Sequence, residues 1–116
     1  MNGSPRYGKD GKWMSWIKDG KAYTQLDDEQ FEEMDKEEQD IVLKWIRDKL
    51  VPRKTPLLIP TSYGLKHLLE RGEKGLYMTN NQFKGAMLLC GFKPVDEHEQ
   101  NWSYGLSKKS PAFKRD

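Results

Sequence analysis

The stretch 78–92 constrains this chain most, because it carries the start and stop signals of one short helix. Thr79 and Gln82 stand three residues apart, as in a capping box, where each side chain bonds to the backbone N–H of the other residue. Gly91 supplies the positive φ that ends a helix in a Schellman turn. The sequence therefore predicts a helix that begins after Thr79 and ends before Gly91.

One face of this predicted helix is apolar. Its members recur at i, i+3, i+4 and i+7, the spacing of a buried stripe: Phe83, Ala86, Met87 and Cys90. The remaining positions are expected to face outward: Asn80, Asn81, Lys84, Gly85 and Leu88. A helix that offers amides and a lysine to solvent can read base edges in DNA, and a plain solvated surface is the alternative interpretation.

The neighbouring segments follow the order of a winged helix-turn-helix. A helix is predicted from about Thr61 to Gly72, and a loop that contains glycine joins it to the helix described above. Two strands are expected afterwards, at 92–95 and 102–108, and together they would make the wing. We therefore predict a winged-helix-like unit of helix, helix and hairpin over residues 61–110.

An Asp19-Gly20 pair separates two aromatic-rich runs near the N-terminus. Asp-Gly is a strong short-range hairpin signal, because both central turn residues need positive φ. The sequence predicts a β-hairpin within residues 13–26. A lone two-stranded hairpin is marginal in water, so Trp13 and Trp16 are expected to pack on the rest of the protein rather than to stack on bases.

Residues 27–50 are predicted to form an acidic amphipathic helix, with Asp27 as its N-cap and Gln30 completing a capping box. Either one long helix or two helices with a break near 34–35 fits the pattern. The apolar stripe comprises Ile41, Val42, Trp45, Ile46 and Leu50. Ten acidic side chains oppose four basic ones, and their position near the N-terminal end fits the helix dipole. An acidic surface that docks a basic partner is the alternative.

Three prolines in residues 51–60 exclude a helix and predict an extended connector. Its apolar end, Leu57 to Ile59, favours an edge strand or an arm held against the core. The expected fold class is α+β. The predicted division is a flexible tail at 1–12, a hairpin plus acidic helix at 13–50, the connector at 51–60, the winged-helix-like unit at 61–110 and a basic tail at 111–116.

Charge is unevenly distributed along the 116 residues, although the formal net charge is only +2. Residues 51–95 hold seven basic side chains against two acidic ones, so this part is the one that favours a polyanion. One cysteine excludes an internal disulfide, and the sequence shows no signal peptide and no long apolar run. We expect a cytoplasmic protein without a membrane partner, and the oligomeric state stays open.

Catalytic and metal-binding patterns are absent from the sequence. His67 and His98 are far apart, and Cys90 lies on the buried stripe of its helix, where a small cysteine is usually inert packing. There is no CxxC or HxxxH spacing that would hold zinc. The sequence therefore predicts no enzyme, no cofactor and no metal.

Nucleic-acid binding is the function that the residues favour. Asn80 and Asn81 stand in the first turn of the second helix, where such helices touch bases. Phosphate contacts are assigned to seven side chains: Arg53, Lys54, Lys66, Arg71, Lys74, Lys84 and Lys93. The acidic loop 96–99 opposes this interpretation. The expected partner is duplex DNA, and the alternative is a protein that docks on the acidic helix and the aromatic hairpin.

Several runs resemble small uncharacterised proteins carried by phages and integrative elements of Gram-positive bacteria: Ser62–Glu70, Thr79–Met87, Cys90–Phe92, Val95-Asp96 and Asn101-Trp102. This likeness covers about half of the chain and implies no known activity. The spacing of Phe83, Met87 and Gly91 before a strand is also similar to the winged-helix tail of phage and poxvirus-type primase-helicases. No Walker-type phosphate loop is present, so the resemblance implies a DNA-binding accessory module rather than an ATPase.

Overall fold

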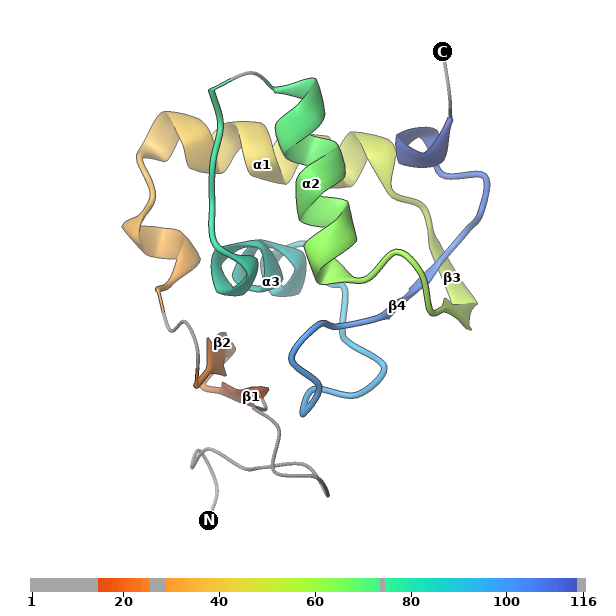
Figure 1. Cartoon of the computed structure of the whole chain (residues 1–116), viewed down its shortest axis with the longest axis horizontal. Coiled ribbons are helices and arrows are strands. Elements are labelled where there is room, and N and C mark those ends of the chain that lie inside the picture. The colour runs from red at the N-terminus through yellow and green to blue at the C-terminus, as the bar shows by residue number, and fades with distance from the viewer. Residues whose placement is uncertain (1–14, 26–28, 74, 115–116) are drawn as a thin grey trace.

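The computed structural model describes residues 15–25, 29–73 and 75–114 (Figure 1). In chain order the elements are β1 (Ser15–Lys18), β2 (Lys21–Thr24), η1 (Phe31–Glu33), α1 (Lys36–Lys49), β3 (Pro52–Leu57), α2 (Ser62–Gly72), α3 (Asn80–Leu89), β4 (Tyr104–Leu106) and η2 (Pro111–Phe113). The predicted α+β class is confirmed. The expected tail at 1–12, Trp13, Asp27 and Lys74 lie outside the described residues.

The start and stop signals of α3 act as predicted. Thr79 Oγ1 accepts a hydrogen bond from the Gln82 backbone N–H at 3.0 Å, and Gln82 Oε1 accepts one from the Thr79 N–H at 3.0 Å. After the helix, Gly91 adopts φ 89° and the Phe92 N–H donates to Met87 O at 2.9 Å. This is a Schellman turn, so both ends of α3 are set by residues within the stretch itself.

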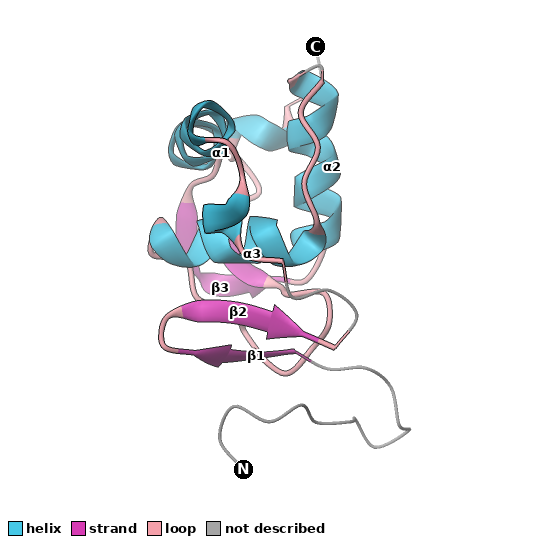
Figure 2. Cartoon of the chain, turned by 90° about the vertical axis from the view of Figure 1, so that its left-hand side faces the viewer, coloured by secondary structure: helices cyan, strands magenta, loops and turns pink. Residues whose placement is uncertain are grey.

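The hairpin at the N-terminus is confirmed as well. Asp19 and Gly20 both have positive φ, 53° and 77°, and β1 pairs antiparallel with β2 in the register Trp16↔Tyr23. The β1–β2 ribbon does not stand alone, because β2 packs against α3 (Figure 2). The Ala22 side chain is fully buried at this contact. The ribbon is therefore supported by the helix, as a two-stranded unit requires.

The acidic segment is divided rather than continuous, which is the second of the two predicted alternatives. A short 3-10 turn, η1, is capped by a reciprocal box between Gln30 and Glu33, and the chain is extended at Met34 before α1 begins. Met34 is buried, so the break turns an apolar side chain into the core. Of the predicted stripe, Ile41 is the exception, with 39% of its surface exposed.

The predicted wing does not form, because the expected strands 92–95 and 102–108 do not pair with each other. Residues 92–95 form no strand and keep one backbone bond to the segment around β4, from the Val95 N–H to Ser103 O at 2.8 Å. Instead β4 pairs antiparallel with β3, so the connector does form an edge strand. The apolar residues Leu58 and Ile59, which were expected in that strand or against the core, lie outside it and are exposed by 65% and 80%. A glycine makes this approach possible, since a Cβ atom on Gly105 would lie 2.1 Å from Arg53 O. The winged-helix pattern of helix, helix and hairpin is thereby interrupted.

Segments 13–50 and 61–110 contribute side chains to one apolar core. It includes Phe31, Val42 and Ile46 from the first and Leu65, Leu69, Phe83, Met87, Trp102 and Leu106 from the second. Trp102 also joins the segments by hydrogen bonds. Its Nε1–H lies 2.8 Å from Ser15 Oγ and 2.9 Å from Glu97 O. Figure 1 shows α3 at the centre of this arrangement, with α1 and α2 above it and the ribbon below.

Tyr104 buries a hydroxyl that bonds to nothing among the described residues. This burial raises the pKa of the hydroxyl well above its ordinary value of about 10. The folded protein therefore keeps this proton at pH values where the unfolded chain releases it. The protonation of Tyr104 therefore leaves the free energy of unfolding unaffected below about pH 10 and lowers it as the pH rises further.

The Tyr104→Phe variant is therefore expected to be more stable than the parent protein by about 1 kcal/mol at pH 7, because it no longer buries an unpaired hydroxyl. It should also lose less stability than the parent between pH 9 and pH 11. Urea unfolding followed by circular dichroism at these pH values measures both effects. A variant less stable than the parent at pH 7 would show that the hydroxyl makes a valuable contact.

Candidate nucleic-acid interface

Asn81 does not face outward, so its predicted role as a base reader is contradicted. Only 1% of its surface is exposed, and its Nδ2 donates to Ala22 O and to Glu29 O, both at 2.8 Å. The side chain thus ties α3 to β2 and to the segment before η1. The helical pattern marked it as outward because polar residues usually are, but these two backbone carbonyls satisfy its donors inside the protein.

Lys84 and Lys66 are also buried, against the prediction that both contact phosphates. Lys84 is fully enclosed, and its Nζ lies 4.7 Å from the centre of the Trp102 ring, as in a cation–π contact. Lys66 Nζ lies 3.3 Å from both carboxylate oxygens of Glu70, and its exposed fraction is 5%. Two of the seven predicted phosphate contacts are therefore structural groups.

Asn80 is half-buried and holds a loop. Its Nδ2 donates to Asn101 Oδ1 at 2.8 Å and lies 3.3 Å from Gln100 O. The amide thereby fixes the start of α3 to the segment that leads into Trp102. It is not available for the bidentate contact to adenine that the sequence predicts.

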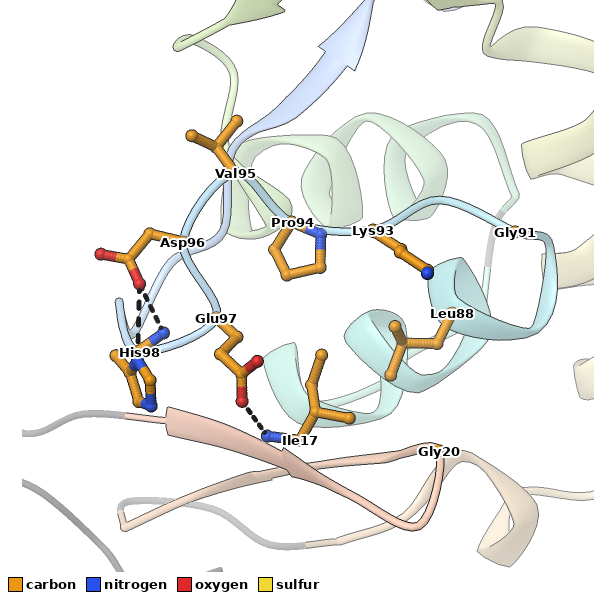
Figure 3. A pocket seen from close by; sticks show the side chains of 10 residues that line it. All are labelled: Ile17, Gly20, Leu88, Gly91, Lys93, Pro94, Val95, Asp96, Glu97 and His98. Carbon is orange, nitrogen blue, oxygen red and sulfur yellow. Dashed lines mark hydrogen bonds and ion pairs between the residues drawn. The ribbon is translucent and has the colours of Figure 1, made fainter. Parts of the chain in front are cut away.

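Lys93 lies on the rim of a groove of about 640 Å³ between the β1–β2 turn and the end of α3 (Figure 3). Ile17, Leu88 and Pro94 supply apolar lining. The acidic groups are engaged locally, since Glu97 Oε2 accepts the Ile17 N–H at 2.9 Å and Asp96 Oδ1 accepts the N–H of residue 98 at 3.0 Å. The acidic loop that opposed DNA binding in the sequence thus bonds to the free edge of β1, the edge that does not pair with β2.

The remaining predicted cations lie apart from α3. Arg71 is exposed at the end of α2, and Arg53 and Lys54 are exposed on β3. Around β3 the fold gathers further exposed basic side chains that sequence reasoning missed. We call this set the basic edge: Lys49, Arg53, Lys54, Lys108, Lys109 and Lys114.

Hydrogen bonds hold the three segments of the basic edge together. The Val51 N–H donates to Ser110 Oγ at 2.9 Å, and the Ser107 N–H donates to Val51 O at 2.8 Å. The end of α1, β3 and the segment from β4 to η2 therefore meet, at the right of Figure 1. The basic tail was visible in the sequence, but its neighbours depend on the β3–β4 pairing that the sequence analysis did not predict.

Acidic side chains are scarce at the basic edge and abundant at the far end of α1. Within residues 44–54 and 107–114 the sequence holds one acid, Asp48, and Lys44 Nζ pairs with it at 2.7 Å. The exposed carboxylates of residues 29–40 lie before α1 or within its first five residues, at the opposite end of a 14-residue helix that is about 21 Å long. The two charge groups are therefore well separated.

Cys90 has the character of a packing residue. Burial raises the pKa of its thiol, and the nearby Arg47 cation only partly opposes this shift. The thiol is therefore protonated at neutral pH, unlike an activated nucleophile. The described residues contain no group of three or more histidine, cysteine or carboxylate side chains placed to hold a metal ion.

The chain matches no known family model, no curated protein and no solved structure. None of the helices formed by the described residues has the length and apolar character needed to cross a bilayer.

Proposed function

We propose that this chain is a non-enzymatic nucleic-acid-binding protein that holds the phosphate backbone of duplex DNA on the basic edge. The observation that carries the proposal is the clustering of six exposed cations from three segments, whose described residues include a single acid, Asp48, that is itself paired. Lysine and arginine are the side chains that most often contact phosphates. Their joint field also attracts a polyanion from solution.

Duplex DNA suits the basic edge because the exposed side chains that cluster there are cations, and a duplex presents its phosphates on the outside. Aromatic side chains stack on unpaired bases, and amides read base edges, whereas lysines at a surface contact phosphates without reading sequence. Binding is thus expected to tolerate any duplex sequence. A sequence-tolerant accessory role in a phage or mobile element agrees with what the resemblance implies.

Replacing Lys49, Lys108, Lys109 and Lys114 together by glutamine is expected to weaken duplex binding at least tenfold. Each lost phosphate contact lowers the slope of log K against log salt by about 0.9, so the slope should become shallower by about 3 to 4. Fluorescence anisotropy with a labelled duplex, titrated from 50 to 200 mM salt, measures the slope. All four side chains are exposed, so the folded structure should persist.

A variant that loses cations elsewhere serves as the control. Lys36, Arg71 and Lys93 are also exposed but lie away from the basic edge, and their replacement by glutamine removes three positive charges, against four in the variant above. The slope for duplex DNA should then stay close to that of the parent. Equal losses in both variants would show that net charge alone, and not the basic edge, governs binding.

The acidic end supports a second candidate function, as a docking module for a basic protein. Six carboxylates within residues 29–40 are exposed, and one of them, Asp40, pairs with Lys36 at 3.2 Å. Absence of duplex binding even at low salt would remove the first proposal. Calorimetric binding of a basic peptide that is lost when Glu32, Glu33 and Glu37 become glutamine would support the second.

A further inference from the structure

The outer face of the β1–β2 ribbon combines stacked aromatic rings with exposed cations. Side chains alternate along a strand, so the buried Ser15, Ala22 and Thr24 mark the face that packs on the protein. The opposite face carries two cross-strand pairs, Trp16↔Tyr23 and Lys18↔Lys21. The two rings stack with centres 5.7 Å apart and planes 12° from parallel.

Hairpin stability alone accounts for the rings but not for the lysines. A cross-strand aromatic pair stabilises a ribbon by a few tenths of a kcal/mol up to about 1 kcal/mol. Like charges directly opposite each other destabilise it. Lys18 and Lys21 are opposite and exposed, and neither forms an ion pair with any described residue. The ribbon therefore keeps two unpaired cations beside its aromatic pair.

We propose that this face binds single-stranded nucleic acid. Unpaired bases stack on the Trp16 and Tyr23 rings, which are both partly exposed, while Lys18 and Lys21 contact the adjoining phosphates. Along each strand the lysine stands two residues from the ring, about 7 Å away, so base and backbone of one strand can be held together. A duplex hides the faces of its bases, so it cannot use the rings in this way.

This site is independent of the basic edge. Figure 1 places the ribbon at the lower left, whereas β3 and the C-terminal segment lie at the right. The two surfaces also differ in chemistry, because the ribbon face combines cations with a stacked pair of rings, whereas the basic edge is a cluster of cations. Each surface can therefore fail its own test while the other proposal stands.

The test measures binding of a labelled oligothymidine of twelve nucleotides at low salt. The Trp16→Leu variant is expected to bind it at least tenfold more weakly, and Trp16→Phe should retain most of the affinity because a ring is still present. Replacing Lys18 and Lys21 by glutamine should reduce the salt slope by about 1.4, at 0.7 for each single-strand contact. Circular dichroism confirms that each variant is folded.

The basic-edge variant, with its four lysines replaced by glutamine, is the matched control. It should lose duplex binding but retain binding of the oligothymidine. Unchanged single-strand affinity in Trp16→Leu, or an equal loss in Trp16→Phe, would overturn the assignment of the rings. No binding of the oligothymidine by the parent protein at 20 mM salt would reject the proposal. The ribbon face would then be assigned to docking of a protein instead.

Discussion

The Asn81→Asp variant is expected to lose about 3 kcal/mol or more of folding free energy at pH 7. Aspartate has the same shape, but its carboxylate would face Ala22 O and Glu29 O, the two carbonyls to which Asn81 Nδ2 donates. Both hydrogen bonds are then lost, and a buried charge is left against two acceptors. Domains of this size are stable by about 5–15 kcal/mol, so the change is a large share of the total.

Urea unfolding at pH 7 and pH 4 measures this loss. The deficit should shrink at the lower pH, because a protonated carboxyl regains one donor. Asn80→Asp is the matched control on the same helical turn. Asn80 is half-buried and its bonds lie near the surface, so the change should cost about 1 kcal/mol or less, helped by the helix dipole. Equal effects at the two positions would contradict the burial of Asn81.

The Gly105→Ala variant is expected to disrupt the pairing of β3 with β4. The added Cβ would lie 2.1 Å from Arg53 O and 3.3 Å from Arg53 C, and both are backbone atoms that cannot rotate away. Relief requires the strands to separate, at a cost of about 3 kcal/mol or more. Because β3 carries Arg53 and Lys54, the variant should also bind duplex DNA more weakly if the basic edge is the binding surface.

Thermal unfolding measures the effect on stability, with an expected fall in Tm of about 10–20 °C. Gly72→Ala provides the control, because a Cβ at this position meets nothing within 4 Å and the residue ends α2. Alanine favours the helix over glycine by up to about 1 kcal/mol, so this variant should be as stable as the parent or slightly more stable. A similar fall in both variants would point to a general intolerance of glycine replacement.

Local features of the fold could be predicted from the sequence because a few adjacent residues determine them. The Thr79–Gln82 box, the Schellman turn at Gly91 and the turn at Asp19-Gly20 each form as the pattern indicates. None of them depends on a distant part of the chain. Capping and turn patterns of this kind predict where a helix or strand begins and ends, but they do not predict which other segments pack against it.

The surroundings of α3 could not be predicted, because they are provided by distant segments. The sequence shows one apolar stripe on this helix, yet β2, η1, α1 and α2 all pack on it. Two polar side chains on its other faces are buried as well. The carbonyls of residues 22 and 29 accept hydrogen bonds from Asn81, and the Trp102 ring contacts the Lys84 cation. Periodicity alone cannot distinguish such a helix from one that is half exposed.

The pairing of β3 with β4 has a signal in the sequence. The connector with its prolines was predicted as an edge strand, and an edge strand needs a neighbour. Gly105 lies inside an alternating run, and an isolated strand glycine often marks the close approach of another backbone. Together these features favour the β3–β4 pair over a wing. Of the predicted phosphate contacts, Arg53 and Lys54 belong to the basic edge. It also contains Lys49, which is near them in the chain, and three lysines that only the pairing brings near, Lys108, Lys109 and Lys114.

The hydrogen bond between Trp102 Nε1 and Ser15 Oγ joins positions 87 residues apart. The Glu97 carboxylate and the carbonyls of residues 97 and 99 bond to β1 from similarly distant positions. During synthesis, therefore, β1 can pair with β2 early, but its contacts with residues 97–102 form only after those residues have left the ribosome. The hairpin is therefore expected to form early and to become fixed to the rest of the fold late, because its long-range hydrogen bonds are among the last to form.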